Sequence, residues 1–120
     1  MFAVASILDE DIPLKPCLAT PLIYPDYSSN DPITLTSSSA FQTRFPAIDA
    51  LNHVTEAATT IIATPFSITL CKEVSQLVDR FLPRALVDPK DLRARNWLHY
   101  AAANAGMAFD ERLLHITHAA

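Results

Sequence analysis

Glycine is almost missing from this sequence, in which Gly106 is the only one among 120 residues. Average usage of about 7 percent would give roughly eight. A G-x-G-x-x-G dinucleotide loop and a phosphate-binding P-loop are therefore both excluded, because each needs several glycines for the backbone to approach a phosphate closely. We therefore expect any cofactor phosphate to be held by something outside this chain, or not to be held at all.

Charged residues are also few, at 18 percent, and thirteen acids against nine Lys and Arg give a formal net charge of -4. Nucleic acid binding needs a concentrated basic face, and the sequence contains none, so we expect no nucleic acid partner. The basic residues of the second half stand among acids, a pattern typical of solvated helix faces. They are Lys72, Arg80, Arg84, Lys90, Arg93 and Arg95.

Cysteine is limited to Cys17 and Cys71, which lie too far apart in sequence for a metal-binding pair. Two free thiols are the favoured interpretation, with a disulfide as the alternative. No apolar stretch approaches the ~20 residues needed to cross a bilayer, and the first residues lack the basic segment of a signal peptide. These absences predict a cytoplasmic protein without a membrane partner.

The chain divides into two parts that differ in composition and periodicity. Most of its prolines fall within residues 1–46, between short β-prone runs reading "FAVASIL", "CLATPLIY" and "ITLT". Proline at this density disfavours long helices, so we expect short strands or extended segments there. Residues 47–120 show helical periodicity instead. The predicted fold class is mainly α, with short N-terminal strands followed by a bundle of about four helices.

The first of these helices is expected from about Asp49, acting as N-cap or first-turn acid, to about Ala63. Pro65 starts the second helix, whose apolar residues recur at spacings of three and four and are predicted to be core. That stripe comprises Phe66, Leu70, Val74, Leu77, Val78 and Phe81.

A third helix is expected from about Lys90 to Phe109, with Asp88 as its cap and Pro89 in its first turn. Its alanine-rich segment "YAAANAGMAF" would let another helix approach closely. A fourth helix is expected to begin near Asp110.

One acid and one imidazole stand out chemically. Asp49 and His53 are at positions i and i+4, so on a helix both side chains leave the same face about one turn apart. A carboxylate oxygen and an imidazole nitrogen so placed can share a divalent ion such as Fe(II) or Zn(II). A plain Asp–His contact that supports the helix is the alternative, and the pair by itself does not decide between them.

The other histidines and the nucleophiles carry weaker signals. His115 and His118 share one helix face, and either could supply a third ligand if the helices pack together. His99 reads as a partly buried helix residue with a hydrogen-bond partner. No serine lies in a G-x-S-x-G elbow, and neither cysteine has an adjacent histidine, so a nucleophilic mechanism has no support.

An ordered series of motifs runs through the chain: "DALNHVTEA", "ATPFS", "LPRALVDPKDLRAR" and "AAANAGMAF", with a histidine nine residues after Phe109. Upstream, "FAVAS" and "PDYSSNDPITLT" extend the series. Together they resemble the iron-containing (group III) alcohol dehydrogenase family over nearly the whole chain.

The resemblance implies roles and architecture. Asp49 and His53 correspond to the first two metal ligands of the family and His118 to the third, while His115 stands where the family usually has glycine. The metal would be Fe(II), with Zn(II) as the alternative. In the complete family protein, NAD(P) and a small alcohol or aldehyde meet between an α/β domain and a helical domain, a dehydroquinate-synthase-like arrangement. Residues 1–46 would be a remnant of the first domain and 47–120 part of the second.

Three hypotheses remain open from the sequence. In the first, the chain is a segment of such a dehydrogenase, expected to be inactive alone and to form homo-oligomers in its complete form. In the second, it is a degenerate, non-catalytic relative that binds a metal or a partner. In the third, it is a helical module in which the three ligand candidates bind nothing.

Overall fold

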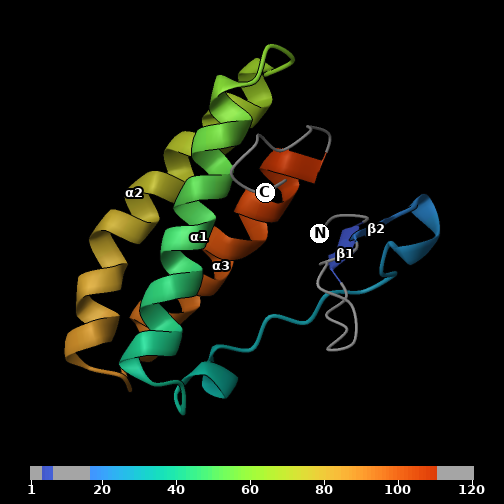
Figure 1. Cartoon of the computed structure of the whole chain (residues 1–120). Coiled ribbons are helices and arrows are strands. Elements are labelled where there is room, and N and C mark those ends of the chain that lie inside the picture. The colour runs from blue at the N-terminus through green and yellow to red at the C-terminus, as the bar shows by residue number, and fades with distance from the viewer. Residues whose placement is uncertain (1–3, 7–16, 111–120) are drawn as a thin grey trace, which may run out of the picture.

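The computed structural model describes residues 4–6 and 17–110. Most of these belong to three helices, α1 (Ala40–Thr59), α2 (Pro65–Val87) and α3 (Leu92–Asp110). Consecutive helices run in opposite directions and all three pack against one another in a bundle (Figure 1). The mainly helical architecture expected from the sequence is thus confirmed. The fourth expected helix lies outside the described residues, except for Asp110, which is the last residue of α3.

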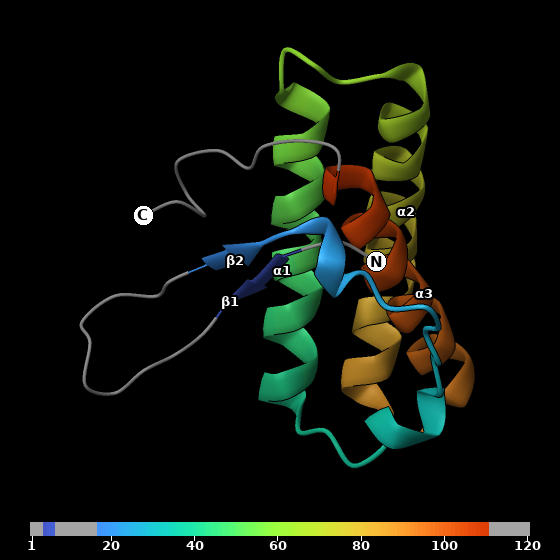
Figure 2. The same cartoon turned by 90° about the vertical axis from the view of Figure 1, so that its right-hand side faces the viewer.

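Two short strands precede the bundle. β1 (Val4–Ser6) and β2 (Cys17–Ala19) pair antiparallel, with Ala5 opposite Leu18. Figure 1 shows this strand pair standing apart from the helices, on the side where α1 and α3 lie, and in Figure 2 it lies in front of α1. The chain then passes through the short 3₁₀ helix η1 (Pro21–Ile23) and an extended segment to a second one, η2 (Pro32–Leu35), which packs against α3.

The β-prone run "ITLT" is not a strand in the structure, because Ile33, Thr34 and Leu35 belong to η2 and Thr36 is its C-cap. The Asp31 carboxylate accepts a hydrogen bond from the Ile33 N–H at 2.9 Å, and Pro32 occupies the first position of the turn. An aspartate followed by proline can start a helical turn with hydrogen bonds to its own neighbours, whereas a β-strand needs a partner strand.

The first long helix begins nine residues before the expected start, so the assignment of Asp49 as its cap is also wrong. Ser39 is the N-cap: its Oγ accepts from the Gln42 N–H at 3.2 Å, and the Gln42 side chain accepts from the Ser39 N–H at 3.3 Å. This reciprocal capping box starts the helix. Pro46, which we expected to end the extended region, lies inside α1. Asp49 consequently sits in the middle of the helix.

The start of α2 follows the sequence closely. Thr64 caps it through a reciprocal capping box with Ser67, and Pro65 takes the first helical position as expected. Most of the apolar stripe is buried, but Phe66 is not, being 72% exposed. It belongs to the first turn of α2, where no other helix or strand of the described residues covers it. The core prediction is wrong for this residue.

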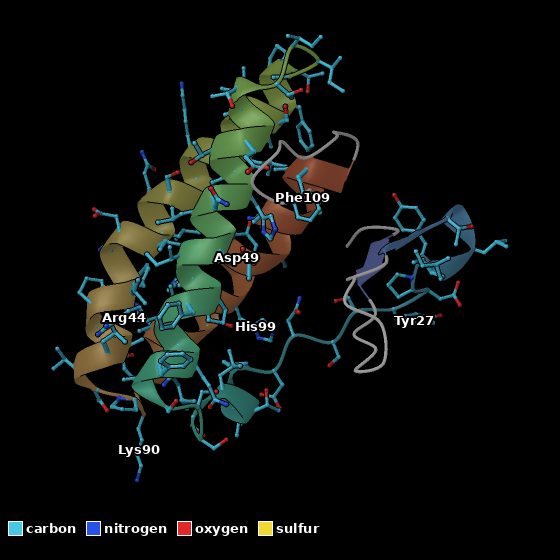
Figure 3. The ribbon with its side chains drawn as sticks, in the orientation of Figure 1. Tyr27, Arg44, Asp49, Lys90, His99 and Phe109 are labelled. Carbon is cyan, nitrogen blue, oxygen red and sulfur yellow. The ribbon has the colours of Figure 1, made fainter. Side chains whose placement is uncertain are left out.

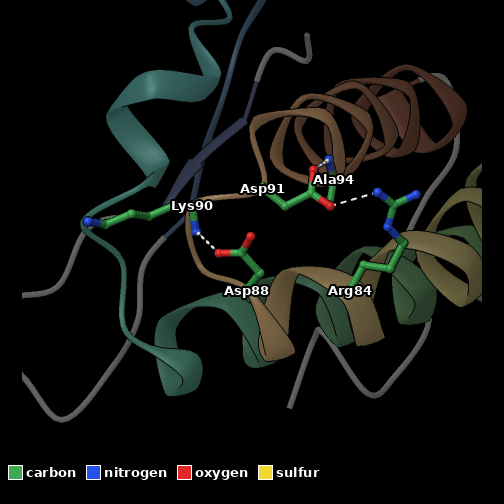
Figure 4. Close-up of polar contacts among 5 residues, drawn as sticks. All are labelled: Arg84, Asp88, Lys90, Asp91 and Ala94. Carbon is green, nitrogen blue, oxygen red and sulfur yellow. Dashed lines mark hydrogen bonds and ion pairs between the residues drawn. The ribbon is translucent and has the colours of Figure 1, made fainter.

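The residue that caps α3 lies three positions after the expected one. Asp91, not Asp88, caps this helix, because its Oδ1 accepts the Ala94 N–H at 2.9 Å (Figure 4). Its other oxygen accepts from Arg84 of α2 at 2.8 Å. Asp88 is the C-cap residue of α2 and accepts from the Lys90 N–H at 3.0 Å. The sequence contains two aspartates that could cap α3, Asp88 and Asp91. The one that caps it, Asp91, is also the one that contacts Arg84.

The core lies where the three helices meet, and it is made of small side chains around a few larger ones. Small residues let helices approach closely, as expected for the alanine-rich segment of α3. The buried alanines are Ala47, Ala50, Ala57, Ala85, Ala94, Ala101, Ala105 and Ala108. The larger buried side chains include Val54, Val74, Val78, Phe81 and Phe109. Cys71 is buried in this core as a free thiol. For Cys17 the favoured interpretation remains a prediction.

Arg95 contradicts the expectation that the basic residues of the second half lie on solvated helix faces. Arg95 is only 3% exposed, in the interface between α3, the start of α1 and the segment preceding it. The sequence pattern around it is that of a solvated face, and only the packing of η2 and α1 against α3 covers it.

Residues 46 and 47 both belong to α1, which continues through the expected boundary between two domains. That division remains a prediction. In the described part of the chain, no helix combines the length and hydropathy of a membrane span.

Candidate metal site

The Asp49 and His53 side chains lie together on one face of α1, as their spacing predicts. The distance between Asp49 Oδ2 and His53 Nδ1 is 3.8 Å. The Asp49 side chain is 57% exposed and that of His53 is 19% exposed, so the pair sits at the edge of the core, open to solvent from the Asp49 side.

This geometry is compatible with a shared ion. An ion that bonds oxygen and nitrogen at about 2.1 Å each can hold two donor atoms no more than about 4.2 Å apart. The observed 3.8 Å falls within this limit and exceeds the length of a good hydrogen bond. One carboxylate and one imidazole also form a donor set that Fe(II) and Zn(II) accept. Asp49 and His53 can therefore serve as two of the ligands of such an ion.

The His53 ring is positioned by α3. It stacks on the Phe109 ring, with the ring centroids 4.6 Å apart and the planes inclined by 28°. Phe109 is itself buried, and Figure 3 places it beside the part of α1 that carries Asp49. Stacking of this kind limits the rotation of an imidazole and so fixes where its nitrogens point.

Two of the predicted ligands are thus brought together, while the third cannot be placed. His118 and the neighbouring His115 lie outside the described residues. Within the described ranges, no three side chains of His, Cys, Asp or Glu form a group that could enclose an ion. The assignment of His118 remains a prediction.

The other reactive groups in the described part of the chain offer no competing site. Burial raises the pKa of the Cys71 thiol, so that it stays protonated near neutral pH and is a poor nucleophile. His99 is partly buried as expected, but the expected hydrogen-bond partner of its Nδ1 is missing among the described residues. Sequence reasoning overlooked the cluster formed by Thr43, Arg95 and His99. The spacing of Arg95 and His99, four residues apart on one helix, was the available signal.

Comparison with known proteins connects this helical unit to a family. The family model described as "Fe-containing alcohol dehydrogenase family, C-terminal" matches residues 45–120. The long-chain primary alcohol dehydrogenase AdhA of Thermoanaerobacter ethanolicus is 49% identical over 118 residues, which are 98% of this chain and 29% of that relative. The 1-propanol dehydrogenase PduQ of Citrobacter freundii is 34% identical over 94% of the chain and 30% of its own length.

Solved structures agree with the sequence matches. The iron-containing alcohol dehydrogenase of Thermococcus thioreducens superposes with a TM-score of 0.83 at 33% identity, over 93% of this chain and 29% of that one. The iron-containing enzyme of Thermotoga maritima gives 0.87 at 26% identity, over 98% and 32%.

These matches and the helical fold place this chain in the class of metal-dependent alcohol dehydrogenases. The chain belongs to the iron-containing alcohol dehydrogenase family. It spans less than a third of the length of the relatives and structures cited above.

Proposed function

We propose that this chain supplies metal ligands to an NAD(P)-dependent alcohol dehydrogenase of the iron-containing family, with Asp49, His53 and His118 as those ligands. The observation that carries the proposal is the 3.8 Å approach of Asp49 Oδ2 to His53 Nδ1 on one face of α1. Family membership supports it, since the model match includes all three residues.

The roles of the residues follow from their chemistry. Asp49 provides a negative charge at the solvent-exposed edge of the site, where a cation can arrive without crossing the core. His53 provides a neutral nitrogen whose direction is held by the Phe109 ring. A divalent ion bound there supplies Lewis acidity, which lowers the pKa of an alcohol hydroxyl. Fe(II) is the expected ion and Zn(II) the alternative.

The cofactor and substrate belong to the same proposal. A nicotinamide cofactor is consistent with the sulfoacetaldehyde reductase of Bifidobacterium kashiwanohense, a structural match at 22% identity whose structure is a complex with NAD+. With a single glycine, this chain has no phosphate-binding loop, so the cofactor phosphates would be held by other residues. A primary alcohol is the proposed substrate class, because AdhA and PduQ are named for long-chain primary alcohols and 1-propanol.

Metal titration by calorimetry tests the ligand assignment directly. We expect the protein to bind Fe(II) under anaerobic conditions, and Zn(II) in a parallel experiment, with a measurable heat. Asp49→Asn, His53→Gln and His118→Gln should each weaken binding by at least about tenfold, because each removes a ligand that the ion needs.

Asp79→Asn is the matched control, since Asp79 is an exposed helical aspartate on α2 whose loss should leave the affinity unchanged. Equal metal affinity in Asp49→Asn and the native protein would refute the ligand assignment. The non-catalytic alternative makes a different prediction: metal binding in the full-length protein without alcohol-dependent formation of NADH or NADPH.

A further inference from the structure

A separate cavity lies between η2, the beginning of α1 and α3. Its volume is about 170 Å³, and neither Asp49 nor His53 lines it. An engineered protein cavity of about 150 Å³ binds benzene, so this one is large enough for a ligand of about six heavy atoms. Its walls are mainly apolar and include Leu35, Pro46, Ala47, Val78, Leu98 and Ala102.

The guanidinium of Arg95 is the charged group of this cavity. Its Nε donates to the Pro89 carbonyl at 3.0 Å, Nη1 donates to the Thr43 hydroxyl, and Nη2 donates to the Ser38 carbonyl at 3.4 Å. These acceptors are all neutral. Among the described residues, no carboxylate comes within ion-pair distance of Arg95.

Burying a cation among neutral acceptors alone costs free energy, because the dipoles of the acceptors offset only part of the hydration that the cation loses. Three of the five guanidinium N–H groups are used in the contacts above. The others remain available as donors. The protein therefore keeps a buried positive charge beside an apolar cavity, and a negative charge placed there would be stabilised.

His99 adds an independent polar group on the same wall. It lies one helical turn after Arg95 on α3 and also lines the cavity. Its Nδ1 is buried and has no hydrogen-bond partner among the described residues. Buried polar atoms without a partner are rare in folded proteins, and His99 carries this one on a side chain that lines the cavity. In the tautomer with hydrogen on Nδ1, the ring donates to an anion.

We propose that this cavity binds a small monocarboxylate, whose carboxylate accepts hydrogen bonds from Arg95 and His99 while its short alkyl chain lies against the apolar wall. The guanidinium matches a carboxylate in shape and charge, and the mainly apolar lining favours a hydrocarbon tail over a purely inorganic anion. This site is independent of the metal site and does not require that the dehydrogenase proposal be correct.

Butyrate is a suitable probe, because its six heavy atoms match the cavity, and butyramide is its neutral counterpart. We expect butyrate to raise the thermal unfolding midpoint of the full chain in a saturable manner, relative to sodium chloride at equal ionic strength. Butyramide should not. Butyrate should also shift the ring NMR signals of His99.

Two variants test the residues without touching the supporting contacts of Arg95. His99→Leu removes the ring nitrogen and should weaken butyrate binding by about tenfold. Ala102→Leu fills the cavity from its exposed edge and should weaken binding by at least about tenfold. Ala103→Leu makes the same change at a neighbouring position that does not line the cavity, and it should bind butyrate as the native chain does.

Absence of saturable stabilisation by butyrate would overturn the proposal, as would equal stabilisation by butyramide. Unchanged binding in Ala102→Leu would also overturn it, even if His99→Leu fails to fold.

Discussion

At the scale of single residues, position in the bundle outweighs residue type. Phe66 and Phe81 lie on the same helix and belong to the same apolar stripe, yet the first is 72% exposed and the second 3%. Phe81 stacks against Trp97 of α3, with ring centroids 5.9 Å apart, and two guanidinium groups lie near its ring. Its contribution to stability therefore comes from α3 as much as from α2.

Replacing each of these two phenylalanines by alanine should separate the effect of burial from the effect of residue type. We expect Phe81→Ala to lower the free energy of unfolding by about 3–5 kcal/mol, because it removes a buried ring and leaves a cavity. Phe66→Ala should change it by less than about 0.5 kcal/mol. Urea denaturation followed by circular dichroism measures both values, and similar losses for the two variants would contradict the observed packing.

At the scale of elements, short polar contacts determine where each helix begins. Asp91 illustrates this for α3: the backbone N–H of Ala94, and then the guanidinium of Arg84, hold the pKa of its carboxyl below the usual value. Both contacts favour the charged form of the carboxylate. The stability that Asp91 contributes is therefore fully present above its unfolded pKa of about 3.9, and it is lost as the pH falls through the lower folded value.

The variant Asp91→Asn keeps a capping side chain and removes the charge. We expect it to be less stable than the native chain at pH 7, with the difference shrinking below about pH 4, where the native carboxylate also becomes neutral. Urea midpoints measured across this range test the prediction. Asp79→Asn, on the exposed face of α2, is the control. A difference that stays constant with pH would show that the charge of Asp91 does not stabilise the helix start.

At the scale of the whole molecule, the described residues leave an apolar stripe uncovered on α1. Phe41, Phe45 and Ile48 follow one another at spacings of four and three residues, all are exposed, and the two phenylalanine rings lie 4.3 Å apart. Contiguous exposed apolar side chains of this kind commonly mark surfaces where proteins associate.

We expect the chain to self-associate as its concentration rises, through this stripe. Phe45→Ser should weaken association by about tenfold, because it removes the central aromatic side chain. Tyr27→Ser, which changes an exposed aromatic residue outside the stripe, should not. Sedimentation equilibrium measures the association constants. A native chain that stays monomeric at all concentrations would count against this role of the stripe.

Much of this protein could be predicted from its sequence, because the deciding interactions lie within a few residues. Pro65 predicted the start of α2, the three-and-four spacing identified most of its buried face, and the Asp49–His53 spacing placed both side chains together on α1. The single glycine excluded a phosphate loop. The two results from spacing depend on backbone geometry that repeats every helical turn, so neighbours in sequence suffice.

Other features were decided only by the tertiary structure. Pro46 indicated an extended region, but the capping box at Ser39 and the packing of α1 against α2 and α3 outweighed it. The burial of Arg95, the exposure of Phe66 and the stacking of His53 on Phe109 all depend on which elements meet, and these contacts join residues far apart in the chain. Sequence spacing fixes the direction of a side chain from its own helix, whereas burial and electrostatic environment are properties of the assembled bundle.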